Sequence, residues 1–217
     1  MSFTLAAILS FSILIAGFIA LARFPRIAKI YYPFVYLIWA GCINETISYF
    51  LIINHNQTII NGVMYGIIES MMLLWFFRNI GVFNRKNWLF YCCIGLFIAI
   101  WVYESFFSKR FGSSFNNYFG IVYSLAIVLL SITAINSLLF SERDILRNPT
   151  FLICIGIVIF FTYKVLVEMF TLYGLRESRS FRMNVYIILM CINLVCNLIY
   201  ALAILWMRKK QAFTLQF

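Results

Sequence analysis

Seven stretches of about 20 mostly apolar residues fill almost the whole chain, and short polar segments separate them. A helix of this length crosses the hydrocarbon core of a bilayer with all of its backbone hydrogen bonds made internally. The stretches cover about residues 2–22, 31–54, 59–79, 87–106, 115–140, 150–173 and 183–207. The sequence therefore predicts an all-α integral membrane protein, in which residues 1–217 form a single domain with seven transmembrane helices.

The composition agrees with this fold class. Of the 217 residues, 64% are hydrophobic and 11% are charged, whereas soluble domains are roughly 45–50% apolar and about 25% charged. The spans leave no room for a soluble catalytic domain. The net charge of +10 comes mostly from Lys and Arg residues that flank the apolar stretches. We therefore read these residues as topology signals and predict no nucleic-acid partner.

The distribution of basic residues predicts the orientation. If the amino terminus lies outside, eleven of the 17 Lys and Arg residues fall on the inner side, five fall on the outer side and Lys164 lies within a span. Because Lys and Arg concentrate on the cytoplasmic side, this indicates an N-out, C-in topology. We expect a multi-pass protein of the cell membrane, in a bacterial inner membrane, with membrane lipids around it.

Motifs of common enzymes and metal sites are missing from the sequence. There is no HExxH, GxSxG, P-loop or Gly-rich dinucleotide motif. The six cysteines lie inside apolar stretches without a CxxC pair, which predicts neither a disulfide framework nor a zinc site. We therefore assign no catalytic residue, metal or cofactor, and we favour a non-enzymatic role while leaving the question open.

Polar residues within four of the predicted helices follow helical spacing, so that each set shares one helical face. The sets are Gly41, Glu45 and Ser48; Asn61, Tyr65 and Glu69; Lys164 and Glu168; and Asn193, Asn197 and Tyr200. The first predicted helix has no comparable set. We expect it at the edge of the bundle, where it would face lipid.

Four of these residues are predicted to lie at the same depth. Each is nine or ten residues from the end of its span on the same face of the membrane, which corresponds to about 15 Å and thus to the middle of the ~30 Å core. They are Glu45, Glu69, Lys164 and Asn193. Four helices are therefore predicted to build one polar centre that widens toward the outer side.

The charges of this centre constrain its chemistry. An isolated charge in hydrocarbon costs at least ~2.5–3.5 kcal/mol, so such groups usually face a partner, water or a ligand. We predict that Lys164 pairs with Glu45 or Glu69. Three carboxylates and one ammonium would leave a net charge of −2, so we expect one or two protonated carboxyl groups, a bound cation or water. The predicted residues for binding a small ligand or proton are Glu45, Glu69, Lys164, Glu168, Tyr65, Asn193 and Asn197.

Several functions fit this pattern. The first hypothesis is a receptor-like or sensor-like membrane protein that binds a small molecule or proton from the outer side and signals through a membrane or cytoplasmic partner. The alternatives are a small proton- or cation-coupled transporter, a membrane-embedded lipid hydrolase, and a structural subunit of a membrane complex. The polar residues also fit a purely structural role as bonds between helices.

Three elements carry a resemblance to other proteins: Asn44-Glu45, the Tyr65 and Glu69 pair, and the run of Asn193, Asn197 and Tyr200. With them the chain resembles, over nearly its whole length, a group of small seven-helix membrane proteins from Bacteroidetes-type bacteria. The resemblance implies a bacterial origin and the seven-helix architecture. It implies no particular activity.

Overall fold

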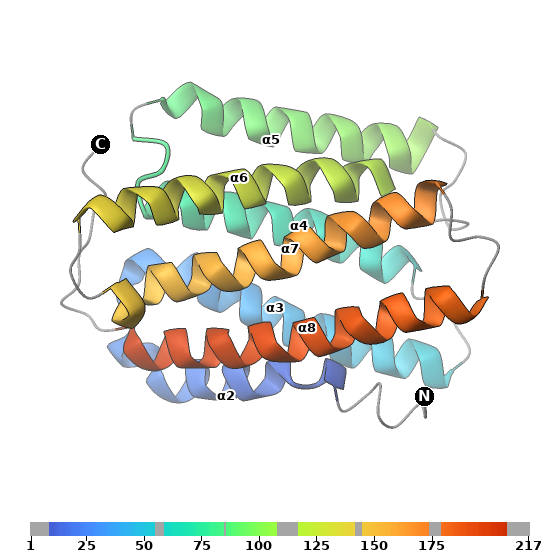
Figure 1. The fold of residues 1–217 in the computed structure, drawn as a ribbon, viewed down its shortest axis with the longest axis horizontal. Helices are drawn as coiled ribbons and strands as arrows, with labels where there is room; N and C mark the ends of the chain where they lie inside the picture. Colours follow the sequence, from blue (N-terminus) through green and yellow to red (C-terminus); the bar gives the residue numbers. More distant parts are fainter. Residues whose placement is uncertain are drawn as a thin grey trace.

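The computed structural model describes residues 9–54, 59–84, 86–107, 117–141, 145–173 and 179–207. Within these residues seven α-helices run along the long axis of the molecule (Figure 1). They are α2 (Ile13–Arg23), α3 (Tyr32–Ile53), α4 (Ile59–Asn79), α5 (Asn87–Val102), α6 (Asn117–Ser141), α7 (Pro149–Tyr173) and α8 (Arg179–Trp206). Short helical segments are η1 (Phe24–Arg26), η2 (Lys29–Tyr31), the π-helical η3 (Tyr103–Phe107) and η4 (Ile145–Arg147). The predicted all-α class is confirmed.

Six helices are long and apolar enough to cross a membrane. They are α3 to α8, and their bounds agree with the predicted spans to within a few residues, counting the η3 turn with α5. Helix α2 has 11 residues, or about 16 Å, and is not among the six. The predicted first span over residues 2–22 is interrupted by a turn at Phe11 and Ser12, and its residues before Leu9 lie outside the described part of the chain.

The helices form a ring with one helix outside it. Around the ring α2, α3, α4, α6, α7 and α8 pack in this order, and α8 closes back onto α2. Helix α5 packs against the outside of α4 and α6 and forms one edge of the molecule in Figure 1. The peripheral helix is thus α5, which has no polar side chain in its sequence after Asn87 other than Tyr91 and its cysteines.

The prediction that the first helix lies at the bundle edge and faces lipid holds in part, because α2 exposes Phe18 and Leu21 but is also a member of the ring. Helix α2 lies between α3 and α8, and its Ala16 and Ala20 are fully buried. A Cβ atom at Gly17 would lie 2.7 Å from the Cys42 Sγ atom, so a larger residue would force the Cys42 side chain to move. Small residues of this kind are typical of helix contacts in membranes. At its end, Arg23 donates a hydrogen bond to the Leu205 carbonyl in the last turn of α8.

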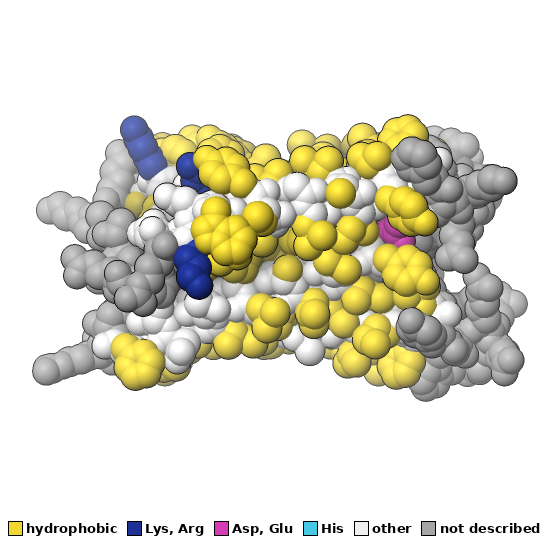
Figure 2. Space-filling model, turned by 90° about the horizontal axis from the view of Figure 1, so that it is seen from above, with side chains coloured by type: hydrophobic (Ala, Val, Ile, Leu, Met, Phe, Trp, Pro, Cys, Tyr) yellow, Lys and Arg dark blue, Asp and Glu magenta, His cyan; other side chains and the backbone are white. Residues whose placement is uncertain are grey.

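Apolar side chains cover the length of the molecule on the face seen in Figure 2, and Lys and Arg side chains gather at one end of it. Phe18 and Phe140, for example, are 67% and 87% exposed. An apolar surface of this extent indicates contact with a membrane. These features are consistent with a multi-pass membrane protein. The described side chains of the basic end are Arg23, Arg26, Lys29, Arg78, Lys86 and Arg147. The basic residues predicted for the opposite side lie outside the described side chains.

Local sequence explains several helix ends. Pro33 lies in the first turn of α3, where a missing N–H group is tolerated. Asn148 precedes Pro149 and caps α7, because its side-chain oxygen accepts a hydrogen bond of 2.8 Å from the Thr150 N–H. Helix α4 ends at Asn79, and Gly81, two residues further on, adopts a positive φ of 91° that favours glycine.

The contact between α7 and α8 depends on Gly156. A Cβ atom at this position would lie 2.5 Å from Cε1 of Tyr200, whose ring is held edge-to-face against Phe34 at 5.2 Å. We expect Gly156→Ala to lower the free energy of unfolding by about 1–3 kcal/mol through overpacking, measured by thermal unfolding in detergent. Gly95→Ala is the matched control, since no atom lies within 4 Å of its Cβ position. Equal stability of the two variants would contradict this packing.

Candidate functional site

A cavity of about 410 Å³ lies inside the ring of helices. Each of the six ring helices contributes lining residues, and α5 contributes none. The volume falls in the range of about 300–1,000 Å³ that is typical of small-molecule sites. The lining includes all seven residues that the sequence predicted: Glu45, Tyr65, Glu69, Lys164, Glu168, Asn193 and Asn197.

The cavity is elongated along the helix axes. Its lining extends over residues 34–45 of α3, 62–73 of α4, 157–168 of α7 and 189–200 of α8. Eleven helical steps correspond to about 16 Å. Toward the end opposite the basic one, the lining reaches Gly62 on α4 and Glu168 on α7, each two residues from the end of its apolar span. On α3 it stops at Glu45, eight residues before the end of the span.

Toward the basic end of the bundle the cavity is closed by large side chains. Its last lining residues there include Phe34, Leu73 and Tyr200. Beyond them the helices are tightly packed, because Phe76 lies 5.7 Å from Phe34 between ring centroids and Phe77 is fully buried. The described side chains therefore separate the cavity from the basic end.

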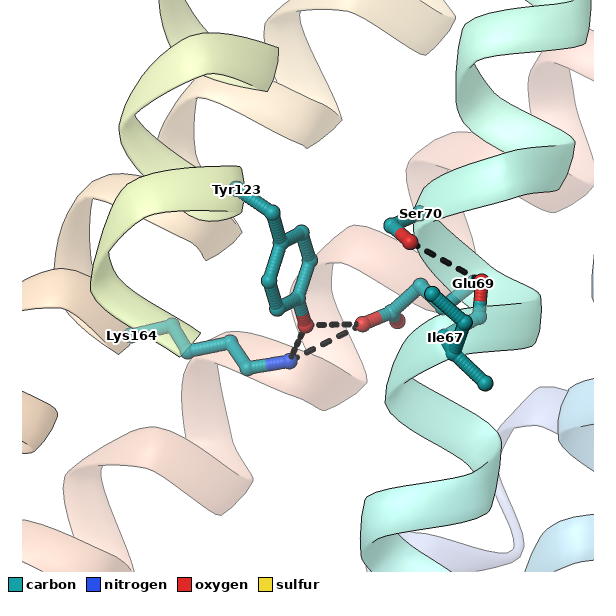
Figure 3. Close-up of polar contacts among 5 residues, drawn as sticks. All are labelled: Ile67, Glu69, Ser70, Tyr123 and Lys164. Atoms are coloured by element: carbon teal, nitrogen blue, oxygen red, sulfur yellow. Dashed lines mark hydrogen bonds and ion pairs between the residues drawn. The ribbon is translucent and has the colours of Figure 1, made fainter. Parts of the chain in front are cut away.

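Lys164, Glu69 and Tyr123 form a hydrogen-bonded charged network in the cavity wall (Figure 3). The Lys164 ammonium forms a salt bridge with Glu69, with 2.9 Å between Nζ and Oε2. The Tyr123 hydroxyl donates a hydrogen bond of 2.5 Å to the same carboxylate oxygen and accepts one from Lys164. The three side chains come from α7, α4 and α6, so the network joins three helices. Of the two predicted partners of Lys164, the structure selects Glu69.

Aromatic rings surround the Lys164 ammonium. Its Nζ atom lies 4.9 Å from the ring centroid of Tyr123, 5.3 Å from that of Phe161 and 5.8 Å from that of Phe160. A cation within about 6 Å of a ring centroid is attracted by the negative face of the ring. Glu69 is 6% exposed. The ion pair thus has a buried carboxylate and a Lys164 side chain that is 21% exposed, and it is satisfied within the protein.

Tyr123 was not predicted as a site residue. It is fully buried on α6, and a Ser next to it is the nearest polar residue on that helix. A single tyrosine in an apolar helix gives no periodic signal. Only the packing of α6 between α4 and α7 brings its hydroxyl to Glu69 and Lys164.

The Glu45 carboxylate lines the cavity without a hydrogen bond or ion pair in the part of the chain that the structure describes. Two further polar side chains of the lining, Tyr65 and Asn193, likewise make no hydrogen bond among the described residues. The Tyr65 hydroxyl faces α3, where it lies 3.3 Å from the Cβ position of Gly41. These groups are available for a molecule in the cavity.

The remaining two predicted residues contact other helices. Glu168 packs against α6, with its Cδ atom 3.4 Å from the Cβ position of Gly120, and it interacts electrostatically with Lys164. Asn197 is buried and donates a hydrogen bond of 2.8 Å to the Ser12 hydroxyl. This bond connects α8 to the turn that precedes α2. Asn197 therefore has a structural role in addition to its place in the lining.

Two polar groups near the end of the bundle opposite the basic one also connect helices. They are not part of the network of Lys164, Glu69 and Tyr123. Asn61 on α4 donates to the side-chain oxygens of Asn44 at 2.9 Å and Ser48 at 2.8 Å on α3. Glu104 in η3 is buried and accepts hydrogen bonds from the backbone N–H groups of Tyr118 and Phe119 in the first turn of α6. A carboxylate is favoured at this position because helix amino termini carry partial positive charge.

Removing the Tyr123 hydroxyl should weaken the network without removing its ion pair. We expect Tyr123→Phe to lower the free energy of unfolding by about 1.5–3 kcal/mol, the usual contribution of a hydrogen bond to a charged group. Chemical unfolding in mixed micelles measures this difference. Tyr36→Phe is the matched control, because the Tyr36 hydroxyl makes no hydrogen bond among the described residues. A Tyr123→Phe variant as stable as this control would contradict the role of the hydroxyl.

Comparison with models of protein families, with curated proteins and with solved structures gives no match for this chain. Inference about its function therefore depends on the geometry of the cavity.

Proposed function

We propose that this protein is a receptor-like membrane protein that binds a small molecule in its central cavity. The supporting observation is that the cavity contains polar groups that the protein leaves unpaired, above all the Glu45 carboxylate. Glu45, Tyr65 and Asn193 are only partly buried and line the cavity. Polar side chains placed in this way can bond to a molecule in the cavity, which favours a binding site over polar residues that only connect helices.

Closure of the cavity toward the basic end supports a receptor in preference to a transporter. Large buried side chains, among them Phe76 and Phe77, fill the bundle between the cavity and the basic end. A transporter requires a second state that opens the cavity to the other face. In a receptor, binding favours one arrangement of the helices, and the change is transmitted to a partner.

We place the partner at the basic end. Following the preference of Lys and Arg for the cytoplasmic side, the basic end lies in the cytoplasm and the cavity is entered from the outer side, in a bacterial inner membrane. A ligand that shifts α7 against α4 through the Lys164–Glu69 bridge would move their ends on the cytoplasmic side, where a membrane or cytoplasmic protein could respond.

Cysteine accessibility tests this proposal. Asn193→Cys, in a background with the six native cysteines replaced by alanine, puts a thiol into the cavity wall. We expect a membrane-impermeant methanethiosulfonate reagent to label it from the outer face of sealed vesicles and not from the inner face. Leu198→Cys on the same helix is the control, because Leu198 is 45% exposed toward the apolar exterior and should stay unlabelled.

Two results would overturn the proposal. A thiol at position 193 that resists the reagent from both faces would mean that the cavity is closed to solutes. Labelling of the thiol at position 193 from both faces would mean that the cavity opens to either side in turn, and would favour the transporter. Thermal unfolding of each variant verifies that the bundle is folded before labelling.

A further inference from the structure

Among the charged groups of the cavity wall, Glu45 differs from the others. Lys164 already forms a salt bridge with Glu69, and Glu168 is in electrostatic contact with the same ammonium. Glu45 has no such partner among the described residues. The excess charge of the cavity is therefore negative, and its accessible part is the Glu45 carboxylate.

The surroundings of Glu45 fit an organic ammonium group better than a metal ion. The described residues contain no group of three or more His, Cys, Asp or Glu side chains that could hold a metal ion, and Ca²⁺ takes six to eight oxygen ligands. A primary ammonium has three N–H donors. The Glu45 carboxylate, the Asn193 amide oxygen and the Tyr65 hydroxyl line the same cavity and offer three unpaired acceptors.

The other half of the cavity is largely apolar, with Tyr200 as a polar side chain of its lining. Toward the basic end its lining includes Phe34, Leu37, Leu73, Ile157 and Phe161. From Glu45 to Phe34 the helix α3 rises by about 16 Å. A molecule that reaches both Glu45 and this apolar half must carry its charge at one end of an extended apolar body.

We infer that the cavity binds a primary amine with a long apolar body, whose ammonium group pairs with Glu45 and whose body lies against the apolar half. This inference rests on the proposed function and specifies its ligand class. The bound ammonium would supply the partner that Glu45 lacks in the protein. An anionic molecule would meet the same carboxylate without a free cation, since Lys164 is already paired with Glu69.

Binding of radiolabelled n-octylammonium to the protein in nanodiscs of zwitterionic lipid tests the inference. Empty nanodiscs correct for partition into lipid, and zwitterionic lipid avoids attraction of the amine to anionic headgroups. Unlabelled 1-octanol and octanoate are the competitors, because they keep the octyl body and change only the charge. We expect saturable binding that octanol and octanoate displace at concentrations at least about tenfold higher than unlabelled octylammonium does.

Variants assign the charge recognition to Glu45. We expect Glu45→Gln to remove the advantage of octylammonium over octanol, and Glu45→Asp to keep part of it. Met190→Trp, which fills the cavity, should abolish saturable binding of all three probes. The inference is wrong if the three probes compete equally, or if Glu45→Gln binds octylammonium as the wild type does. In either case the cavity would bind the octyl body without recognition of its charge by Glu45. Absence of saturable binding by every probe also overturns it, and overturns the proposed function too if Asn193→Cys is unreactive.

Discussion

Lys164→Met should lower the free energy of unfolding by about 3–5 kcal/mol, the usual cost of removing one partner from a buried ion pair. The reason is that Glu69 is 6% exposed and Lys164 Nζ lies 2.9 Å from its carboxylate. Without the ammonium, the carboxylate keeps only the Tyr123 hydroxyl as a donor. Methionine retains the apolar contacts of the lysine stem with the aromatic rings. Chemical unfolding in mixed micelles gives the difference.

The double variant Glu69→Gln with Lys164→Met separates the loss of charge pairing from the loss of packing. Because both charges are removed, we expect it to recover at least half of the lost stability. Lys86→Met is the surface control, since Lys86 is exposed at the basic end, and it should stay within about 0.5 kcal/mol of the wild type. If Lys164→Met matched Lys86→Met in stability, the salt bridge would not hold α4 and α7 together.

Glu45→Gln should change the free energy of unfolding in the opposite direction to Lys164→Met. It removes an unpaired charge from the cavity wall and keeps the shape of the side chain, so we expect the ligand-free protein to gain about 0.5–2 kcal/mol of stability, which is typical where a functional residue is replaced. The same variant should lose recognition of the ammonium probe. Thermal unfolding in the absence of any probe measures the stability term.

Replacing a residue that only connects helices should lower the stability, in contrast to replacing Glu45. Asn61→Leu removes the hydrogen bonds to Asn44 and Ser48 and should lower stability by about 0.6–2 kcal/mol. The contrast between the two variants therefore separates a binding role from a structural role. If Glu45→Gln destabilised the protein as much as Asn61→Leu does, Glu45 would be a structural residue and the case for a ligand at this position would fail.

The sequence predicted the six long helices because each is a run of about 20 apolar residues with polar ends. Run length alone could not predict that the first helix is short. The turn at Phe11 and Ser12 is accompanied by a hydrogen bond from Asn197, which is 185 residues away along the chain. Such a bond leaves no trace in local hydropathy. For the same reason the position of α2 inside the ring was missed.

Helical spacing predicted the cavity wall to a useful extent. All seven predicted residues line the cavity, because the spacing puts them on the inner faces of α3, α4, α7 and α8. The spacing could not decide whether Lys164 pairs with Glu45 or Glu69, since both carboxylates have the same predicted depth. The order of the helices around the ring decides this, because α6 brings Tyr123 between α4 and α7.

An experimental high-resolution structure of the protein, purified in lipid, tests the central claim most directly. We predict elongated density in the cavity, with a polar end within hydrogen-bonding distance of the Glu45 carboxylate and an apolar end against Phe34 and Leu73. A cavity filled by side chains, with Glu45 bonded to protein donors on neighbouring helices, would contradict the claim and leave the charged network as a purely structural feature.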